Sequence, residues 1–194
     1  MAALLAMQAV HAAEPAAGAQ QFWPQWRGPL ATGAAPLADP PLEWSETKNV
    51  KWKVELPGFG TSTPVIWGGR VFILTAVPTG RKGEAIASEP PPAAPASPNS
   101  GERRGRAGGG LGRSEKPTEA YQFTVVCLDR KTGKTLWQKV AREEVPHEGH
   151  HKDHGFASAS PVTDGQHLLA YFGSRGLYCF DLDGNLKWEK DFGD

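Results

Sequence analysis

The densest group of side chains able to bind a metal ion lies in residues 147–154: His147, Glu148, His150, His151, Asp153 and His154. Imidazole and carboxylate groups are common ligands of zinc, so this stretch could hold Zn²⁺ or a similar ion. A helix would place His150 and His154 on one face. Pro146 and Gly149 argue against a helix, however. The sequence favours the alternative, a polar loop in which one or two histidines hydrogen-bond to a neighbouring element.

A hydrolase triad is the second chemistry that the residue types allow. Ser158 and Ser160 follow His151 closely in sequence. Asp164 would be the third member. The sequence has no Gly-x-Ser-x-Gly turn to present a nucleophilic serine. We therefore assign no catalytic, cofactor-binding or metal-binding residue.

The composition argues against some classes of partner. Lys and Arg together number 21, as do Asp and Glu, so the 194-residue chain has a formal net charge of zero. Such a chain has no global attraction to nucleic acid or to an anionic membrane. The 7 Trp and 23 Gly residues favour an all-β protein with many turns.

Residues 1–13 are apolar and rich in alanine, with small residues on both sides of His11, as signal peptidase requires. We predict a signal peptide cleaved near Ala12. No Lys or Arg precedes Arg27, so a disordered alanine-rich tail is the alternative. The apolar run is shorter than the roughly 20 residues that a transmembrane helix needs.

Residues 14–48 form a linker and an aromatic N-terminal segment. Trp23 and Trp26 are separated by Pro24, which excludes a regular helix or a central strand. We expect this cluster to fill a groove on the folded body. The alternative is an exposed site for a ligand or partner.

A hairpin pattern occurs twice and organises the rest of the chain. In residues 127–137, a strand ending in Cys-Leu-Asp is followed by a Thr-Gly turn and a second strand that contains Trp137. Residues 179–188 repeat the unit with one residue fewer in the turn. The two tryptophans are 51 residues apart, and recurrence at this spacing predicts a repeat architecture.

Each repeat has four short strands joined by tight turns, which is typical of a β-propeller blade. The predicted fold class is all-β, a β-propeller of four-stranded antiparallel blades, with about two blades in residues 49–194. Cys127 and Cys179 fall at equivalent strand positions, so we expect buried thiols and no disulfide. The predicted strands are 63–67, 70–76, 121–128 and 134–140, then 158–163, 166–172, 176–182 and 185–190.

Two segments depart from the repeat. Residues 78–119 are rich in Pro, Gly, Ala, Ser and Arg, so we expect a disordered surface loop. Arg103–Arg106 resembles an RG-type nucleic-acid tract, but no aromatic residue accompanies it. Residues 49–56 alternate polar and apolar side chains, which predicts a lone fourth strand. Its Trp52 looks like the tryptophan of the repeat, although no Cys-x-Asp strand precedes it. In a propeller, such a strand would complete the last blade and close the ring.

The repeated unit resembles the tryptophan-docking repeat of quinoprotein β-propellers. That repeat runs small residue, any residue, Asp, two residues, Thr-Gly-Lys, two residues, Trp. It matches Cys127 to Trp137, and Cys179 to Trp188 with a one-residue deletion. The resemblance implies that each Trp ring lies between blades and packs on a peptide of the next blade, while Asp and the turn fix the hairpin.

The family includes pyrroloquinoline-quinone (PQQ)-dependent dehydrogenases and the outer-membrane β-barrel assembly lipoprotein BamB. The motifs at Trp23–Pro29, Trp52 and Phe156–Asp181 are more narrowly similar to secreted PQQ-like repeat proteins of planctomycete-type bacteria. In that group a single His precedes the Phe-Ala-Ser stretch and corresponds best to His151. The resemblance thus also favours a structural loop at 147–154.

For a quinoprotein dehydrogenase, the resemblance implies a Ca²⁺ site, a catalytic Asp and, in many members, two adjacent cysteines. This sequence has no adjacent Cys pair. We therefore predict a non-catalytic binding or scaffold module of a secreted, periplasmic or envelope protein, with protein partners, further blades and no cofactor. The alternatives are a fragment of a dehydrogenase, which would use PQQ and calcium, and a sensor domain of a larger protein.

Overall fold

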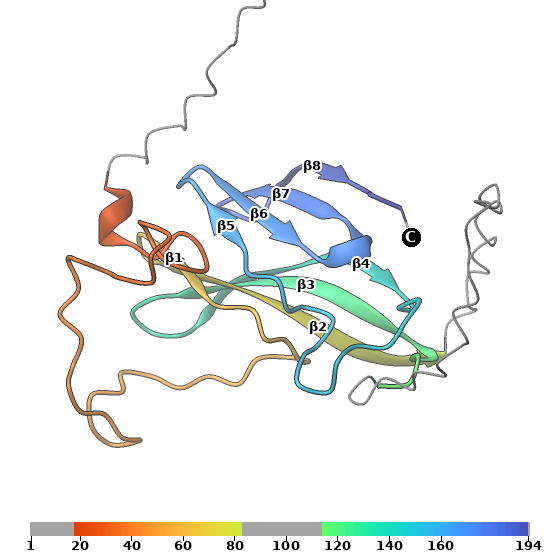
Figure 1. The fold of residues 1–194 in the computed structure, drawn as a ribbon, viewed down its shortest axis with the longest axis horizontal. Coiled ribbons are helices and arrows are strands. Elements are labelled where there is room, and N and C mark those ends of the chain that lie inside the picture. The colour runs from red at the N-terminus through yellow and green to blue at the C-terminus, as the bar shows by residue number, and fades with distance from the viewer. Residues whose placement is uncertain (1–17, 83–113, 194) are drawn as a thin grey trace, which may run out of the picture.

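The computed structural model describes residues 18–82 and 114–193, which form two stacked four-stranded antiparallel sheets (Figure 1). The predicted all-β class is confirmed. In both sheets the strands follow sequence order, as they do in propeller blades. The first sheet has β1 (Val65–Trp67), β2 (Arg70–Lys82), β3 (Glu119–Asp129) and β4 (Thr135–Glu144), and the second has β5 (Val162–Thr163), β6 (His167–Tyr171), β7 (Leu177–Asp181) and β8 (Leu186–Lys190). Two 3₁₀ helices are also present, η1 (Ala19–Gln21) and η2 (Gly173–Arg175).

Strands β2 and β3 are longer than predicted. Lys82 at the end of β2 pairs with Glu119 at the start of β3. The first five residues and the last residue of the predicted insert at 78–119 therefore belong to strands. The register shifts after Pro78, and an irregularity of this kind accommodates a residue without an N–H group. Residues 83–113, the rest of the predicted loop, lie outside the described part of the chain.

The first strand of each blade is shorter than predicted. Strand β1 begins at Val65 and β5 at Val162, and a proline precedes each. Upstream of β1, the amide of Thr63 donates to the side chain of Ser160 at 2.9 Å instead of to a strand. The two sheets are therefore joined by a side-chain contact at the point where strands were expected to continue.

The predicted strand at 49–56 is not a strand in the structure. Alternation of polar and apolar residues gives only one face for packing, and a strand also needs a hydrogen-bonded neighbour. Trp52 and Leu56 nevertheless pack on the first sheet, against the cluster of Val71, Val126 and Leu128. The segment therefore covers the face of the first sheet that points away from the second.

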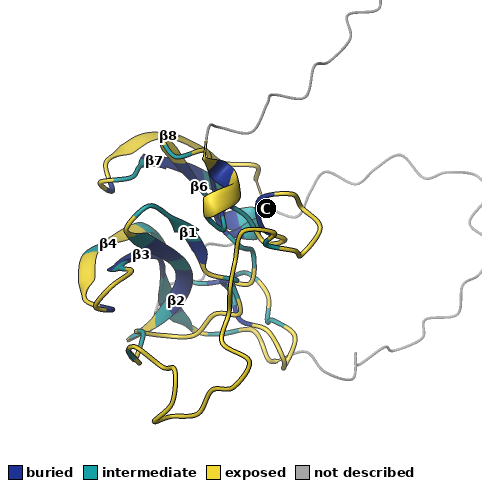
Figure 2. Ribbon diagram, turned by 90° about the vertical axis from the view of Figure 1, so that its left-hand side faces the viewer, coloured by how far each residue is buried: buried dark blue, intermediate teal, exposed yellow. Residues whose placement is uncertain are grey.

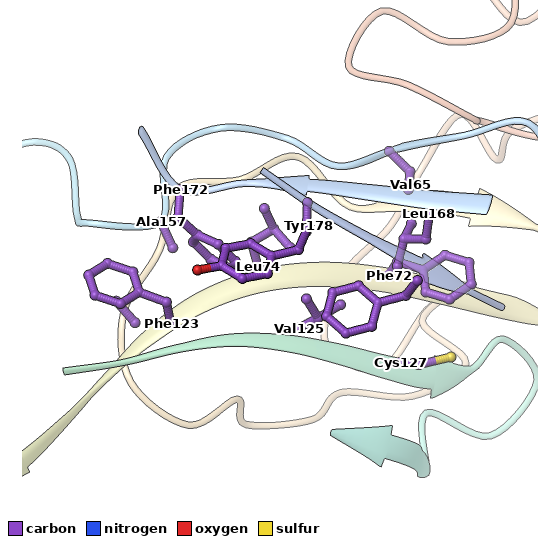
Figure 3. Packing of buried hydrophobic residues seen from close by; sticks show 13 residues of the cluster. Val65, Phe72, Leu74, Phe123, Val125, Cys127, Ala157, Leu168, Phe172 and Tyr178 are labelled. Atoms are coloured by element: carbon purple, nitrogen blue, oxygen red, sulfur yellow. The ribbon is translucent and has the colours of Figure 1, made fainter. Parts of the chain in front are cut away.

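The main core lies between the two sheets (Figure 3). Phe72, Leu74 and Val125 of the first sheet are fully buried. They belong to one cluster with Leu168 and Tyr178 of the second sheet. Figure 2 shows the buried residues of β2 and β3 inside the stack and the exposed strand β8 at its outside. The second sheet therefore has one buried and one exposed face.

The aromatic N-terminal segment joins the first strands of both sheets. Trp23 and Ile66 exchange two backbone hydrogen bonds, of 3.1 and 2.7 Å. The carbonyl of Pro24 accepts a hydrogen bond of 2.9 Å from the amide of Thr163. Trp23 and Pro24 thus pack on the folded body as predicted, while Trp26 stays 64% exposed. Residues 1–13, the predicted signal peptide, lie outside the described residues. Within residues 18–82 and 114–193, no helix is long and apolar enough to cross a bilayer.

The two cysteines are buried and free, as predicted. Burial raises the pKa of the Cys127 thiol to about 12, and burial also raises the pKa of Cys179. Because the thiolate is the reactive form, both thiols should react slowly with a disulfide reagent in the native protein. Labelling should reach two thiols per chain only after unfolding. Rapid labelling of either one without denaturant would contradict this burial.

Candidate functional site: the tryptophan docking surfaces

Trp137 on β4 docks on the turn that joins β7 and β8. Its indole Nε1–H donates to the carbonyl of Leu182 at 3.0 Å. Its ring lies on Gly184, where a Cβ would come within 2.8 Å of the indole. Gly184 also has a positive φ of 83°, a conformation that L side chains rarely adopt. Glycine is therefore required at this position both by the backbone and by the tryptophan above it.

Trp52 makes the same contact on the first sheet. Its Nε1–H donates to the carbonyl of Arg130 at 3.0 Å. A Cβ on Gly133 would lie 2.7 Å from its ring. The predicted role of Trp52 as a repeat tryptophan is confirmed, although its segment forms no strand. Each docking turn in the described residues thus already holds one tryptophan.

An aspartate shapes each docking turn. Asp129 accepts hydrogen bonds from the amides of Lys131 and Thr132 and from the Thr132 hydroxyl. Asp181 accepts hydrogen bonds from the amides of Asp183 and Asn185. The carboxylate groups thus satisfy the backbone donors of turns that expose the acceptor carbonyl to a tryptophan.

Acid should weaken these turns. The Thr132 hydrogen bonds hold the pKa of Asp129 below its usual value, and Lys187 and Asn185 do the same for Asp181. A carboxylate whose pKa is lowered in the folded state stabilises the fold above its unfolded pKa of about 3.9, and this stabilisation is lost as the pH falls through the folded pKa. We expect the urea midpoint to fall between pH 5 and pH 2. Asp129→Asn and Asp181→Asn should each flatten this dependence, and an unchanged slope would contradict the assignment.

Two further contacts hold the first sheet on the second. The ring of Trp67 lies on Gly165, where a Cβ would be 2.3 Å from it. Arg70 forms an ion pair of 2.5 Å with Asp183. Within the first sheet, Phe72 of β2 lies beside the docked Trp137 of β4, with ring centroids 5.9 Å apart. Sequence analysis missed the Trp67 contact because Trp67 lies outside the repeated motif.

Trp188 is the repeat equivalent of Trp137 but lies on the outer face of the second sheet. The register shows the equivalence, since Trp137 pairs with Cys127 and Trp188 pairs with Cys179. Trp188 is 47% exposed. A hollow of about 320 Å³ lies beside it, lined by Leu169 and Cys179 among others. This surface is the candidate functional site.

The histidine-rich loop makes local contacts instead of converging on one point. His150 Nδ1–H donates to the carbonyl of His151 at 2.8 Å, and its ring packs edge-on against Phe156. His151 Nδ1 accepts from the amide of Asp153, and His154 Nδ1 lies 3.4 Å from the hydroxyl of Thr61. In the part of the chain that the structure describes, no three His, Cys, Asp or Glu side chains are placed to share a metal ion.

His147 belongs to a buried charged cluster that sequence analysis missed. Arg175 on η2 is 5% exposed. It donates to His147 Nδ1 at 2.5 Å and forms an ion pair with Glu144. The hydrophobic pattern gave no signal for the Arg175–Glu144 pair, because the two residues are 31 positions apart and lie on separate elements, η2 and the end of β4. A cavity of about 370 Å³ lies between this cluster and the loop.

The side chains of the considered triad point to separate structural contacts. The Ser158 hydroxyl donates to the carbonyl of Gly155 at 2.7 Å. The Ser160 hydroxyl accepts from Thr63, as described above. Asp164 accepts hydrogen bonds from the amides that follow it in the β5–β6 turn. The structure thus assigns a backbone contact to each of these residues.

Comparison with known proteins supports the repeat assignment. Residues 122–194 match a family model described as outer membrane protein assembly factor BamB. This range covers most of β3, all of β4 and the whole second sheet. No curated protein matches the chain. The narrower planctomycete-type similarity stays a prediction. The match supports the predicted PQQ-like repeat in residues 122–194, and the two blade-like sheets with their docked tryptophans are consistent with it.

Proposed function

We propose that the chain is a non-catalytic binding or scaffold module, and that the outer face of β5–β8 binds a further blade-like sheet. The observation that carries this proposal is the exposure of Trp188. Its equivalent in the first sheet, Trp137, is docked on a turn of the following sheet. A large indole left half-exposed beside a hollow is typical of a protein-binding surface.

The outer face of the second sheet carries apolar residues at positions equivalent to those on the buried face of the first sheet. By the strand register, Val162 and Leu169 correspond to Val65 and Phe72. Val65 and Phe72 are fully buried beneath the second sheet, whereas Val162 is 42% exposed. A sheet with an apolar face of this kind is stabilised when another layer covers it.

A second copy of the chain is a poor occupant for this surface. Trp188 needs a turn that offers a free carbonyl and a glycine for its ring. The turn at Gly133 already holds Trp52, and the turn at Gly184 already holds Trp137. The expected partner is therefore another four-stranded sheet whose docking turn is free, either on the same polypeptide or on a different one.

The proposed location is the cell envelope or the secreted space. The apolar, alanine-rich start of the chain and the similarity to an outer membrane assembly factor support it. Protein partners fit this role, and the docking contacts need no cofactor. The absence of an adjacent cysteine pair in the sequence favours a binding or scaffold module over a quinoprotein dehydrogenase.

The cofactor part of the proposal has a direct test. Addition of PQQ and Ca²⁺ should leave the melting temperature of the folded chain unchanged. A ligand at about 100 times its Kd would stabilise the folded state by about 2.7 kcal/mol, which is easily seen as a shift. Such a shift would favour the dehydrogenase alternative.

The docking surface can be tested with a synthetic hairpin. A backbone-cyclised peptide carrying Leu177–Lys190 presents the docking turn with its carbonyl free. Added to the ¹⁵N-labelled full chain, it should shift the indole N–H resonance of Trp188 and slow its exchange with solvent. The Trp137 resonance should not move. Trp188→Phe supplies the assignment and the control, and an unperturbed Trp188 resonance at millimolar peptide would refute the docking surface.

A further inference from the structure

The hollow beside Trp188 lies on the face of the second sheet that is equivalent to the buried face of the first sheet. It measures about 320 Å³ and is lined by Val162, Thr163, Asp164, His167, Leu169, Cys179 and Trp188. Four of these seven residues have an apolar side chain or a buried thiol: Val162, Leu169, Trp188 and Cys179. A partner that covers this face must place a side chain in the hollow, because unfilled apolar space between packed layers is destabilising.

Two substitutions between the repeats account for the hollow. The first sheet places Phe72 beside Trp137, whereas the second places the smaller Leu169 beside Trp188. At the β1–β2 turn the first sheet has Trp67, whose ring contacts the second sheet. The second sheet has Asp164 at that turn. A ring is thus missing at each of two positions where the first sheet supplies one.

The polar rim of the hollow is already satisfied within the chain. Asp164 accepts hydrogen bonds of 2.8 and 2.6 Å from the amides of Gln166 and His167, and its second oxygen lies 3.1 Å from His167 Nδ1. Asp181, which pairs with His167 in the strand register, is held by Lys187. The polar groups at the rim therefore need no charged partner, and the apolar lining of the hollow determines which side chain of a partner fits it.

We infer that the partner of this surface carries an aromatic side chain on its docking turn, at the position that Leu182 occupies in this chain. Leu182 follows the aspartate of its turn, provides the carbonyl that accepts the Trp137 indole, and packs against the main core. At the outer face, a ring at that position would fill the space that Phe72 fills in the first sheet. It would also contact the exposed face of Trp188.

This inference rests on the proposed docking function, and it makes the surface selective. A blade with a leucine on its turn leaves the hollow partly empty. A blade with Phe or Tyr there fills it. The surface would thus distinguish its partner from a copy of the chain's own second sheet by shape complementarity.

The test compares four versions of the cyclic hairpin of residues 177–190: the natural Leu182 form and the variants Leu182→Ala, Leu182→Met and Leu182→Phe. Binding to the full chain is followed by the Trp188 indole resonance. The Phe form should bind about fivefold more tightly than the Leu form, and the Ala form should bind about fivefold more weakly. The methionine side chain is apolar and similar in volume to leucine but has no ring, so the Met form should bind like the Leu form.

A variant of the chain provides the matched control. Leu169→Phe restores the ring that the first sheet has and fills the hollow from within. It should remove or reverse the preference for the Phe hairpin while binding the Leu hairpin at least as well. If all four hairpins bind equally, or if Leu169→Phe leaves the preference unchanged, the inference is wrong although the docking surface stands. If none binds, the docking function itself is refuted.

Discussion

Replacing Trp137 by alanine should lower the free energy of unfolding by about 3 kcal/mol or more, which is the range for truncating a packed aromatic side chain. The ring packs between Gly184 and Phe72 and its N–H is hydrogen-bonded to Leu182. The variant would lose the apolar contacts and leave the carbonyl without its partner. Because these contacts join the two sheets, the cooperativity of unfolding should also decrease.

The matched control is Trp188→Ala in the same chain. Trp188 has the same place in the repeat, but it is half-exposed on the outer face. Its loss should cost less than about 1 kcal/mol, as for most exposed positions. Urea denaturation followed by circular dichroism measures both variants. Equal destabilisation by the two substitutions would mean that Trp188 is already docked in the free chain, contrary to the structure.

Replacing Gly184 by alanine should have a comparable effect, about 3 kcal/mol. An alanine at φ 83° costs about 1–2 kcal/mol for the backbone alone. Its Cβ would also lie 2.8 Å from the Trp137 ring, so the tryptophan must move off the turn and lose part of its contacts. Gly133→Ala should behave alike, through Trp52.

Gly68→Ala separates the two causes. Gly68 also has a positive φ, of 56°, but among the described residues no heavy atom beyond the glycine and its two chain neighbours lies within 4 Å of the position of a Cβ. This variant should therefore lose only the backbone part, about 1–2 kcal/mol. Thermal unfolding of the three variants should rank Gly68→Ala as the mildest. A Gly184 variant no worse than the Gly68 variant would show that the tryptophan does not rest on the glycine.

The hairpins and their tryptophans could be predicted from the sequence because their signals are local. Asp129, Gly133 and Trp137 lie within nine residues, and each has a conformational requirement that a single turn explains. The same holds for the second hairpin. The repeat then allowed Trp52 to be assigned a docking role without any strand before it.

The remaining features depend on contacts between distant residues, which local patterns do not encode. The alternation in 49–56 predicted a strand. In the structure the segment packs Trp52 on the first sheet but does not pair with it as a strand. Residues 78–119 were expected to form a loop, yet a register shift after Pro78 lets β2 continue to Lys82. The Arg175–Glu144 pair and the outer-face hollow depend on how two sheets stack. The hollow arises from differences between equivalent residues of the two faces, such as Phe72 and Leu169, and neither repeat shows it alone.

Hydrogen exchange of the indole N–H groups tests the central claim most directly. In the free chain at neutral pH, the N–H groups of Trp52 and Trp137 should exchange slowly, because each donates to a carbonyl. The N–H of Trp188 should exchange rapidly and should become protected when the docking hairpin is added. Protection of Trp188 equal to that of Trp137 in the free chain, or rapid exchange at Trp137, would contradict the account of one docked and one unoccupied blade surface.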